Sequence, residues 1–209
     1  ARPHESDLLV TVSNRSAGAE SATIRAALIG GVYRATIKGG GSAEQRVALT
    51  LPDWGRDLEI DVEMDRSAWN RFTDFGLTVL DTIGRIVADA PLNYATGRLR
   101  LKLEDGHAGL PIQVALLPGL ADADDERSWT VSLRVRLYAR SAMPLEPTDP
   151  NDAGAARVPA GGSRTIGFRM IDSPWALGEG FVPLGLVMAE TKGPTWTMRV
   201  ALAPPAGTP

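Results

Sequence analysis

The side chains best suited to chemistry are acids that gather in the loops of the sequence. Carboxylates in a loop are the oxygen ligands that Ca²⁺ binds in sets of about six to eight. The first group is Asp122, Asp124, Asp125 and Glu126, and the second is Asp149, Asn151 and Asp152. Neither group has the residue order of an EF-hand loop, and acids set close together are commonly just solvated. Calcium at 122–126 is therefore a hypothesis, and we predict no other cofactor.

Side chains that serve as nucleophiles or general bases are scarce. The chain has no cysteine, which excludes disulfides, thiolate metal ligands and a cysteine nucleophile. His4 stands in the N-terminal tail and His107 in a glycine-flanked turn, whereas a serine triad or a zinc site needs an imidazole held on a rigid scaffold. We predict that this protein is not an enzyme and has neither catalytic nor cofactor-binding residues.

One acidic stretch has a spacing compatible with glycoside cleavage. Glu59, Asp61 and Glu63 are alternate residues, so a strand would place neighbouring carboxyl groups about 6.5–7 Å apart on one face, within the range of such chemistry. These acids alternate with Leu58, Ile60, Val62 and Met64. Because regular alternation already explains each acid as part of the water-facing side of a sheet, we favour that interpretation.

The acidic segment has basic counterparts elsewhere in the chain. Arg98, Arg100 and Lys102 alternate with leucines, and Arg134 and Arg136 alternate with the apolar residues of 129–137. Burial of an apolar side chain contributes about 1.5–3 kcal/mol, against roughly 0.2–1 kcal/mol for a cross-strand charge pair. The apolar faces therefore drive folding, while the charges select neighbours. We predict that the acids of 58–65 lie opposite or diagonal to arginines of one basic strand.

A period of two dominates the whole sequence and predicts an all-β fold. Turn residues such as Gly39–Ser42 separate the alternating segments, as in antiparallel sheets. We expect an antiparallel β-sandwich, jelly-roll-like, with a smaller C-terminal β extension. Only Asp65 to Phe72 resembles a helical turn, capped by Asp65 or Ser67. The expected strands are 7–13, 20–38 with a break at Gly30-Gly31, 44–51, 57–65, 75–81, 84–89, 97–104, 111–117, 128–139, 163–171, 180–189 and 195–203.

The composition changes after Arg140 and suggests a division of the chain. Residues 141–162 hold four prolines and no periodic apolar pattern. We therefore predict a sandwich domain at 1–140, a Pro/Gly-rich linker at 141–162, and a three-stranded extension with a Pro-rich tail at 163–209. Three strands are marginal on their own, so the extension is expected to join the first domain or to lean on a partner.

Overall composition limits the classes of partner. Apolar residues make up 44% and charged residues 22%, as in ordinary globular proteins. A net charge of −3 is too weak a field to hold nucleic acid. No stretch reaches the roughly 18 apolar residues of a membrane span. The sequence begins Ala1-Arg2-Pro3, from which we expect a processed N-terminus and an extracytoplasmic protein, periplasmic or secreted.

The tryptophans divide into expected core and expected contact residues. Trp129 and Trp196 fall in phase with apolar alternation, which predicts that both are buried. The others stand beside proline, glycine or charged residues, where aromatic side chains can stack on sugars or anchor protein interfaces. The segment 173–178 with Phe181 is the most interface-like. The predicted interface residues are Trp175, Leu177, Phe181, Trp54 and Trp69.

The stretch 54–140 resembles a known family of modules. It contains Trp69–Asp81 (WNRFTDFGLTVLD), Gly84-Arg85 and the segment 90–99 (APLNYATGRL). This pattern resembles the β-sandwich after the catalytic domain of some secreted bacterial subtilisin-like serine peptidases, and more widely pre-peptidase C-terminal and proprotein-type jelly-roll modules. The resemblance implies a non-catalytic module that assists folding, secretion, substrate access or oligomer contacts, because the peptidase's own catalytic segments are absent.

Together these features predict a non-catalytic, extracytoplasmic structural or assembly subunit. We expect it to bind and brace a larger protein complex through protein contacts, as a membrane-extrinsic polypeptide braces a membrane-embedded, energy-converting complex. Two alternatives stay open. The first is an accessory C-terminal module of a secreted subtilisin-like peptidase, and the second is a carbohydrate-binding sandwich with a groove lined by Trp54, Trp69 or Trp175.

Overall fold

The structure is a computed structural model that describes residues 6–92, 94–103, 111–152, 155–170, 179–191 and 195–201. These residues form two antiparallel β-sheets, which confirms the predicted all-β sandwich. Among them, no helix has the length and apolar character needed to cross a membrane. The strands are β1 Ser6–Ser13, β2 Glu20–Gly40, β3 Gln45–Thr50, β4 Gly55–Met64, β5 Phe72–Leu80, β6 Ile86–Pro91, β7 Thr96–Lys102, β8 Pro111–Leu120, β9 Ser128–Pro147, β10 Ala155–Val158, β11 Ser163–Met170, β12 Val182–Glu190 and β13 Thr195–Ala201.

The predicted helical turn is present as α1, Arg66–Trp69, with Asp65 as its N-cap. The Asp65 carboxylate accepts a hydrogen bond of 2.7 Å from the backbone N–H of Ser67, which satisfies a donor that the first turn of a helix leaves free. A second short helix, η1, covers Pro150–Asp152.

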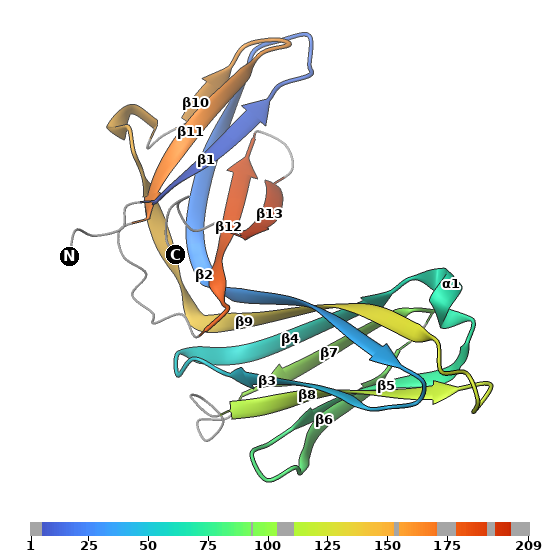
Figure 1. Cartoon of the computed structure of the whole chain (residues 1–209). Coiled ribbons are helices and arrows are strands. Elements are labelled where there is room, and N and C mark those ends of the chain that lie inside the picture. Colours follow the sequence, from blue (N-terminus) through green and yellow to red (C-terminus); the bar gives the residue numbers. More distant parts are fainter. Residues whose placement is uncertain are drawn as a thin grey trace. The chain divides into compact units, whose positions relative to one another are not determined.

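The chain divides into two compact units (Figure 1). Of the described residues, unit 1 contains 6–30, 141–170 and 182–201, and unit 2 contains 31–140 and 179–181. The long strands β2 and β9 are shared between the units. Residues 20–30 of β2 and 141–147 of β9 belong to unit 1, and residues 31–40 and 128–140 belong to unit 2. The expected break at Gly30-Gly31 is therefore a boundary between units, although the strand itself continues through it.

The predicted division at 140 and 162 differs from this arrangement. Residues 6–30 belong with the C-terminal part of the chain, and the expected linker contains the end of β9, the short helix η1 and all of β10. The sequence was misleading because three of the four prolines fall at the ends of elements: Pro147 closes β9, Pro150 opens η1 and Pro159 follows β10. The fourth, Pro144, lies within β9.

Unit 2 is a sandwich of two sheets. In one sheet, β4 lies between β7 and β9, with β2 beyond β9, and the other has the order β3-β8-β5-β6. The alternating apolar residues meet between the sheets, where Ile60, Phe75, Val114 and Val135 are fully buried. Trp129 is 2% exposed and packs edge-on against Phe75 at 5.4 Å between ring centroids, which confirms its predicted place in the core.

Unit 1 takes its strands from both ends of the chain. β11 lies between β1 and the end of β9, while β2 lies between β10 and β12, and β13 follows β12. Ile24 and Leu28 of β2 are buried, as are Ile166 and Phe168 of β11. The predicted C-terminal strands thus complete a core that begins with β1 and β2.

Candidate functional site

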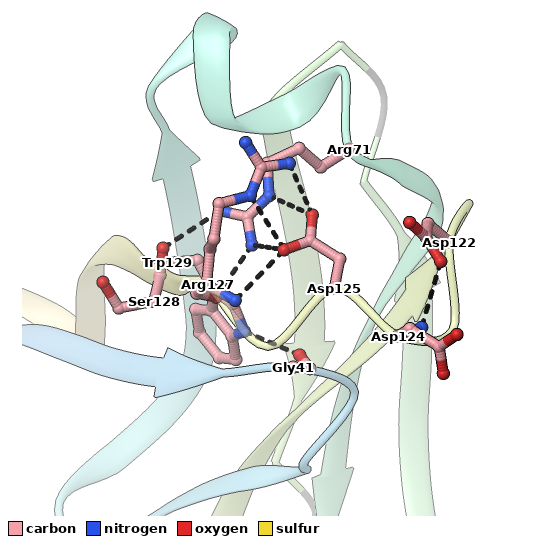
Figure 2. Close-up of polar contacts among 8 residues, drawn as sticks. All are labelled: Gly41, Arg71, Asp122, Asp124, Asp125, Arg127, Ser128 and Trp129. Atoms are coloured by element: carbon pink, nitrogen blue, oxygen red, sulfur yellow. Dashed lines mark hydrogen bonds and ion pairs between the residues drawn. The ribbon is translucent and has the colours of Figure 1, made fainter.

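The loop of the calcium hypothesis is organised around one carboxylate, that of Asp125 (Figure 2). Arg71 donates from Nε to Oδ2 at 2.8 Å and from Nη2 to Oδ1 at 3.0 Å. Arg127 donates from Nε to Oδ1 at 2.9 Å and from Nη2 to Oδ2 at 2.7 Å, and its backbone N–H donates to Oδ1 at 3.0 Å. Both carboxylate oxygens of Asp125 are therefore occupied by guanidinium groups.

The two arginines fix the charge of this carboxylate. Hydrogen bonds from Arg127 and then Arg71 hold the pKa of Asp125 far below its ordinary value of 3.8, and Asp125 in turn raises the pKa of Arg127. The side chain of Asp125 is only 6% exposed, so water has little access to it. This geometry gives Asp125 a structural role, and calcium at 122–126 stays a hypothesis.

The other acids of the loop are not gathered around a common point. The Asp122 Oδ1 atom accepts from the backbone N–H of Asp124 at 3.0 Å, an arrangement that shapes the turn (Figure 2). In the described part of the chain, no three acidic or histidine side chains converge as metal ligands would. His4 and His107 lie outside the described residues.

The arginine pair also joins separate segments of unit 2. Arg71 Nη1 donates to the Ser128 carbonyl at 3.0 Å, and the Ala121 N–H donates to the Arg71 carbonyl at 2.9 Å. One residue along, the Trp129 indole N–H donates to the Gly41 carbonyl at 3.0 Å. A Cβ atom at Gly39 would lie 2.1 Å from the Trp129 ring, so this strand approaches the indole only because residue 39 is glycine. We call Arg71, Asp125, Arg127, Trp129 and Gly39 the arginine knot.

The acidic face of β4 is matched by arginines from both neighbouring strands. Glu59 lies opposite Arg100 and Arg136, at 2.9 Å from Arg100 Nε and 2.6 Å from Arg136 Nη1. Asp61 lies opposite Arg98, whose Nε is 2.5 Å away, and also pairs with Arg136. The predicted pairing is confirmed, and it involves both basic strands instead of one.

These ion pairs favour one of the two interpretations of Glu59 and Asp61, a water-facing side of a sheet, over the other, glycoside cleavage. Partial burial raises the pKa of Asp61, but hydrogen bonds from Arg98 and Arg136 outweigh it and leave that pKa below its ordinary value. A general acid for glycoside cleavage needs the opposite shift. The side chain of Glu59 is only 5% exposed beneath Arg100 and Arg136, so it belongs to a charge network on the outer side of the sheet.

The predicted contact aromatics occupy several environments. Trp54 and Trp69 are half-buried and pack against the core of unit 2. Phe181 is 6% exposed and lies 5.8 Å from the Tyr33 ring, so its predicted exposure is wrong. It is a core residue because β2 presents an aromatic partner that the local sequence did not reveal. Trp175, Leu177 and the side chain of Trp196 lie outside the described residues.

A surface that the sequence did not reveal lies on the outer side of the β3-β8-β5-β6 sheet. Leu117 of β8 is 40% exposed and Ile86 of β6 is 67% exposed. Between these strands lies β5, where Leu80 pairs with Ile86 and Gly76 pairs with both Leu117 and Pro91. We call the five positions Gly76, Leu80, Ile86, Pro91 and Leu117 the sparsely charged face. Two charged residues lie on the same side of the sheet: Asp89, whose partner Thr78 lies between Gly76 and Leu80 on β5, and Arg46, which pairs with Ala115. The sequence alone could not reveal this surface, because Ile86 and Leu117 are far apart in the sequence and only the register of the strands brings them onto one face.

Unit 1 contains an apolar groove of about 750 Å³. Residues 10–16, at the end of β1 and in the turn after it, form one side. The rest of the lining is mostly apolar side chains of β2, β10 and β12, namely Ala22, Ile24, Val158, Val187 and Ala189, together with the polar residues Glu20 and Thr191. Among the tryptophans whose side chains the structure describes, Trp54, Trp69 and Trp129, none lines this groove.

Comparison with known proteins shows no family for this chain. No family model and no curated protein matches it. Among solved structures, the Yersinia pseudotuberculosis-derived mitogen is 13% identical, with 61% of this chain and 95% of that chain covered and a TM-score of 0.37. The periplasmic inhibitor of g-type lysozyme from Aeromonas hydrophila is 11% identical, with 52% and 87% covered and a TM-score of 0.36. The infectious bursal disease virus VP2 subviral particle is 14% identical, with 83% and 42% covered and a TM-score of 0.28. No functional statement follows from likenesses this weak, and the resemblance of 54–140 to peptidase modules stays a prediction.

Proposed function

We propose that this protein is a non-catalytic structural subunit that binds a protein partner in a larger assembly. The observation that carries the proposal is the sparsely charged face of unit 2. The extracytoplasmic location expected from the sequence belongs to the same proposal.

The two outer sides of unit 2 differ in a way that favours one of them for binding. On the β4 side, Glu59 and Asp61 are already neutralised by arginines within the chain. On the other side, Leu117 of β8 and Ile86 of β6 expose apolar surface on the two strands that flank β5. The centre of a protein interface is rich in apolar contacts, which matches these two positions, and the charges of Asp89 and Arg46 lie beside them.

The state of the acidic side chains supports a role without catalysis. Asp125 and Asp61 both have lowered pKa values because arginines hold them as carboxylates. Carboxylates tied into ion pairs stabilise a fold, whereas catalytic acids and bases have pKa values near the working pH. The described side chains with the strongest electrostatic interactions are thus those that build unit 2.

A charge-insertion experiment tests the proposal. The tagged chain is isolated by gentle lysis from cells that produce it naturally, and its bound proteins are identified by crosslinking and mass spectrometry. Wild type is expected to retain a partner at fixed stoichiometry, and the double variant Leu117→Lys with Ile86→Lys is expected to lose it.

The matched control is Ile83→Lys, which changes an apolar residue that is 72% exposed in the turn between β5 and β6. This variant is expected to keep the partner, and all variants are checked for wild-type thermal unfolding. Retention of the partner by the double variant would remove the sparsely charged face from the proposal.

A further inference from the structure

The groove of unit 1 follows the edge of strand β1. Its wall includes the consecutive residues Val10, Thr11, Val12 and Ser13. Successive side chains of a strand point to opposite faces, so a groove over one face would be lined by alternate residues only. A groove lined by consecutive residues therefore runs beside the strand, where its backbone is accessible.

The backbone on that side of β1 has no strand partner in the described part of the chain. β1 ends the order of its sheet and pairs only with β11. The Asn14 N–H donates to the Gly162 carbonyl at 2.9 Å, in register with the pairing of Ser13 and Ser163. Because bonded residues alternate along an antiparallel ladder, Leu9, Thr11 and Ser13 direct their N–H and C=O groups away from β11.

Most of the β1 edge lacks the charges and prolines that usually protect exposed edges. Asp7 near its start is the one charged residue of the strand, and residues 8–13 read Leu-Leu-Val-Thr-Val-Ser, without charge or proline. Leu9 is 68% exposed. Edge strands are commonly protected by charged side chains or proline. The edge strand β7 carries Arg98 and Arg100, and the edge strand β6 carries Asp89 and Pro91. Residues 8–13 of β1 have neither a charge nor a proline in the corresponding part of the strand.

We infer that the β1 edge binds an extended segment of a partner protein, which adds to the sheet as a further strand. This inference rests on the proposed function and names a second surface for it. Backbone hydrogen bonds to Leu9, Thr11 and Ser13 would hold the segment, and its alternate side chains would enter the groove over Val187 and Ala189. The segment is uncharged, with valine, isoleucine or leucine at alternate positions and no proline where it must donate to β1.

Two other occupants fit the groove less well. A second copy that presents its own β1 offers only Leu9 as an exposed apolar side chain to fill it, because Val10 is buried in its own unit and Val12 is half-buried. The chain's own C-terminal residues, 202–209, include Pro204 and Pro205, which have no N–H to donate.

The test measures residue-resolved amide exchange by NMR on the full chain. The probe is an acetylated peptide of alternating threonine and valine with a lysine at each end, and its control is the same peptide with N-methylated valines. The probe is expected to slow exchange at Leu9, Thr11 and Ser13 at least about tenfold, while Val10 and Val12, already bonded to β11, stay unchanged. The control peptide is expected to have no effect.

Variants of the edge make the test specific. Thr11→Pro removes one N–H that faces the groove, and Leu9→Lys adds a charge on an exposed side chain without touching the core. Both are expected to weaken peptide binding at least about tenfold, whereas Leu117→Lys, in unit 2, leaves it unchanged. If Thr11→Pro fails to fold, the effect of Leu9→Lys on peptide binding is the test of the inference.

Three results would overturn the inference. The first is no protection at Leu9, Thr11 and Ser13 at saturating or millimolar peptide. The second is protection without peptide that disappears on dilution, which would mean a second copy. The third is protection without peptide that disappears when 202–209 are deleted, which would mean the chain's own tail. The peptide test uses no natural partner, so a negative result in it does not affect the partner experiment of the proposed function. A negative result in the partner experiment likewise does not affect the peptide test.

Discussion

At the scale of single residues, the arginine knot shows how a cluster of acids can be explained without a ligand. The sequence places Asp122, Asp124, Asp125 and Glu126 together, and composition alone suggests calcium. The structure instead gives Asp125 two arginines, one of them 54 positions away in the chain. A sequence indicates which residues are charged, but a pairing over such a distance depends on the fold.

The knot predicts how stability depends on pH. The folded pKa of Asp125 lies below its ordinary value of 3.8, so its ion pairs stabilise the fold fully above about pH 3.8, and this contribution is lost as the pH falls toward the folded pKa. Asp125→Asn should therefore lower stability most near neutral pH, and its difference from wild type should shrink below about pH 3.8. Urea unfolding at several pH values measures this.

The control for this prediction is Asp124→Asn, a neighbouring exposed acid whose side chain makes no ion pair in the structure. It should change stability little at any pH. A constant gap between Asp125→Asn and wild type across the acid range would show that the ion pairs do not act through the charge of Asp125.

At the scale of elements, the alternation of apolar and polar residues was sufficient to predict most strands and the pairing of β4 with a basic strand. The charges of 58–65 and of the two basic segments predicted neighbours, and β4 does lie between β7 and β9. Strand β10 was missed because four residues without apolar alternation give no periodic signal. The extension of β9 to Pro147 was missed because prolines in the sequence indicated a linker.

The charge network of β4 predicts a measurable role for Arg136. This side chain is 14% exposed and pairs with both Glu59 and Asp61, so Arg136→Met leaves two carboxylates close together with less compensation. We expect a loss of about 2–3 kcal/mol in the free energy of unfolding, between the about 3–5 kcal/mol of a fully buried pair and the about 0–1 kcal/mol of an exposed one. Urea unfolding at neutral pH checks this value.

A matched variant is Arg85→Met, which breaks the ion pair to Asp81 in the turn between β5 and β6. Arg85 is 77% exposed, so its loss should leave the unfolding midpoint nearly unchanged. Equal effects of the two substitutions would mean that burial of the β4 network does not strengthen it.

At the scale of the whole molecule, the order of the sequence is not the order of the units. Residues 6–30 complete unit 1 together with segments that follow residue 140, and no local pattern indicates such a return of the chain. The fold class followed from the period of two, whereas the domain boundaries required pairings such as that of β1 with β11, more than 150 positions apart. The sparsely charged face and the β1 edge depend on these same long-range pairings.

This organisation predicts the behaviour of the fragment 1–140. The fragment contains β1 but lacks its partner β11, so the amides of Leu8, Val10 and Val12 should exchange as freely as those of an unfolded chain. The amides of Ile60 and Val135, in unit 2, should stay protected. Protection of β1 in the fragment equal to that in the full chain would contradict the division into units described here.

Native mass spectrometry of the complex isolated from its natural source shows whether the protein works by binding another protein. We predict a species that contains this chain and at least one different protein at a fixed ratio, and we predict that Leu117→Lys with Ile86→Lys releases the chain. A single-chain mass alone, from gently isolated wild-type protein with intact folding, would contradict it.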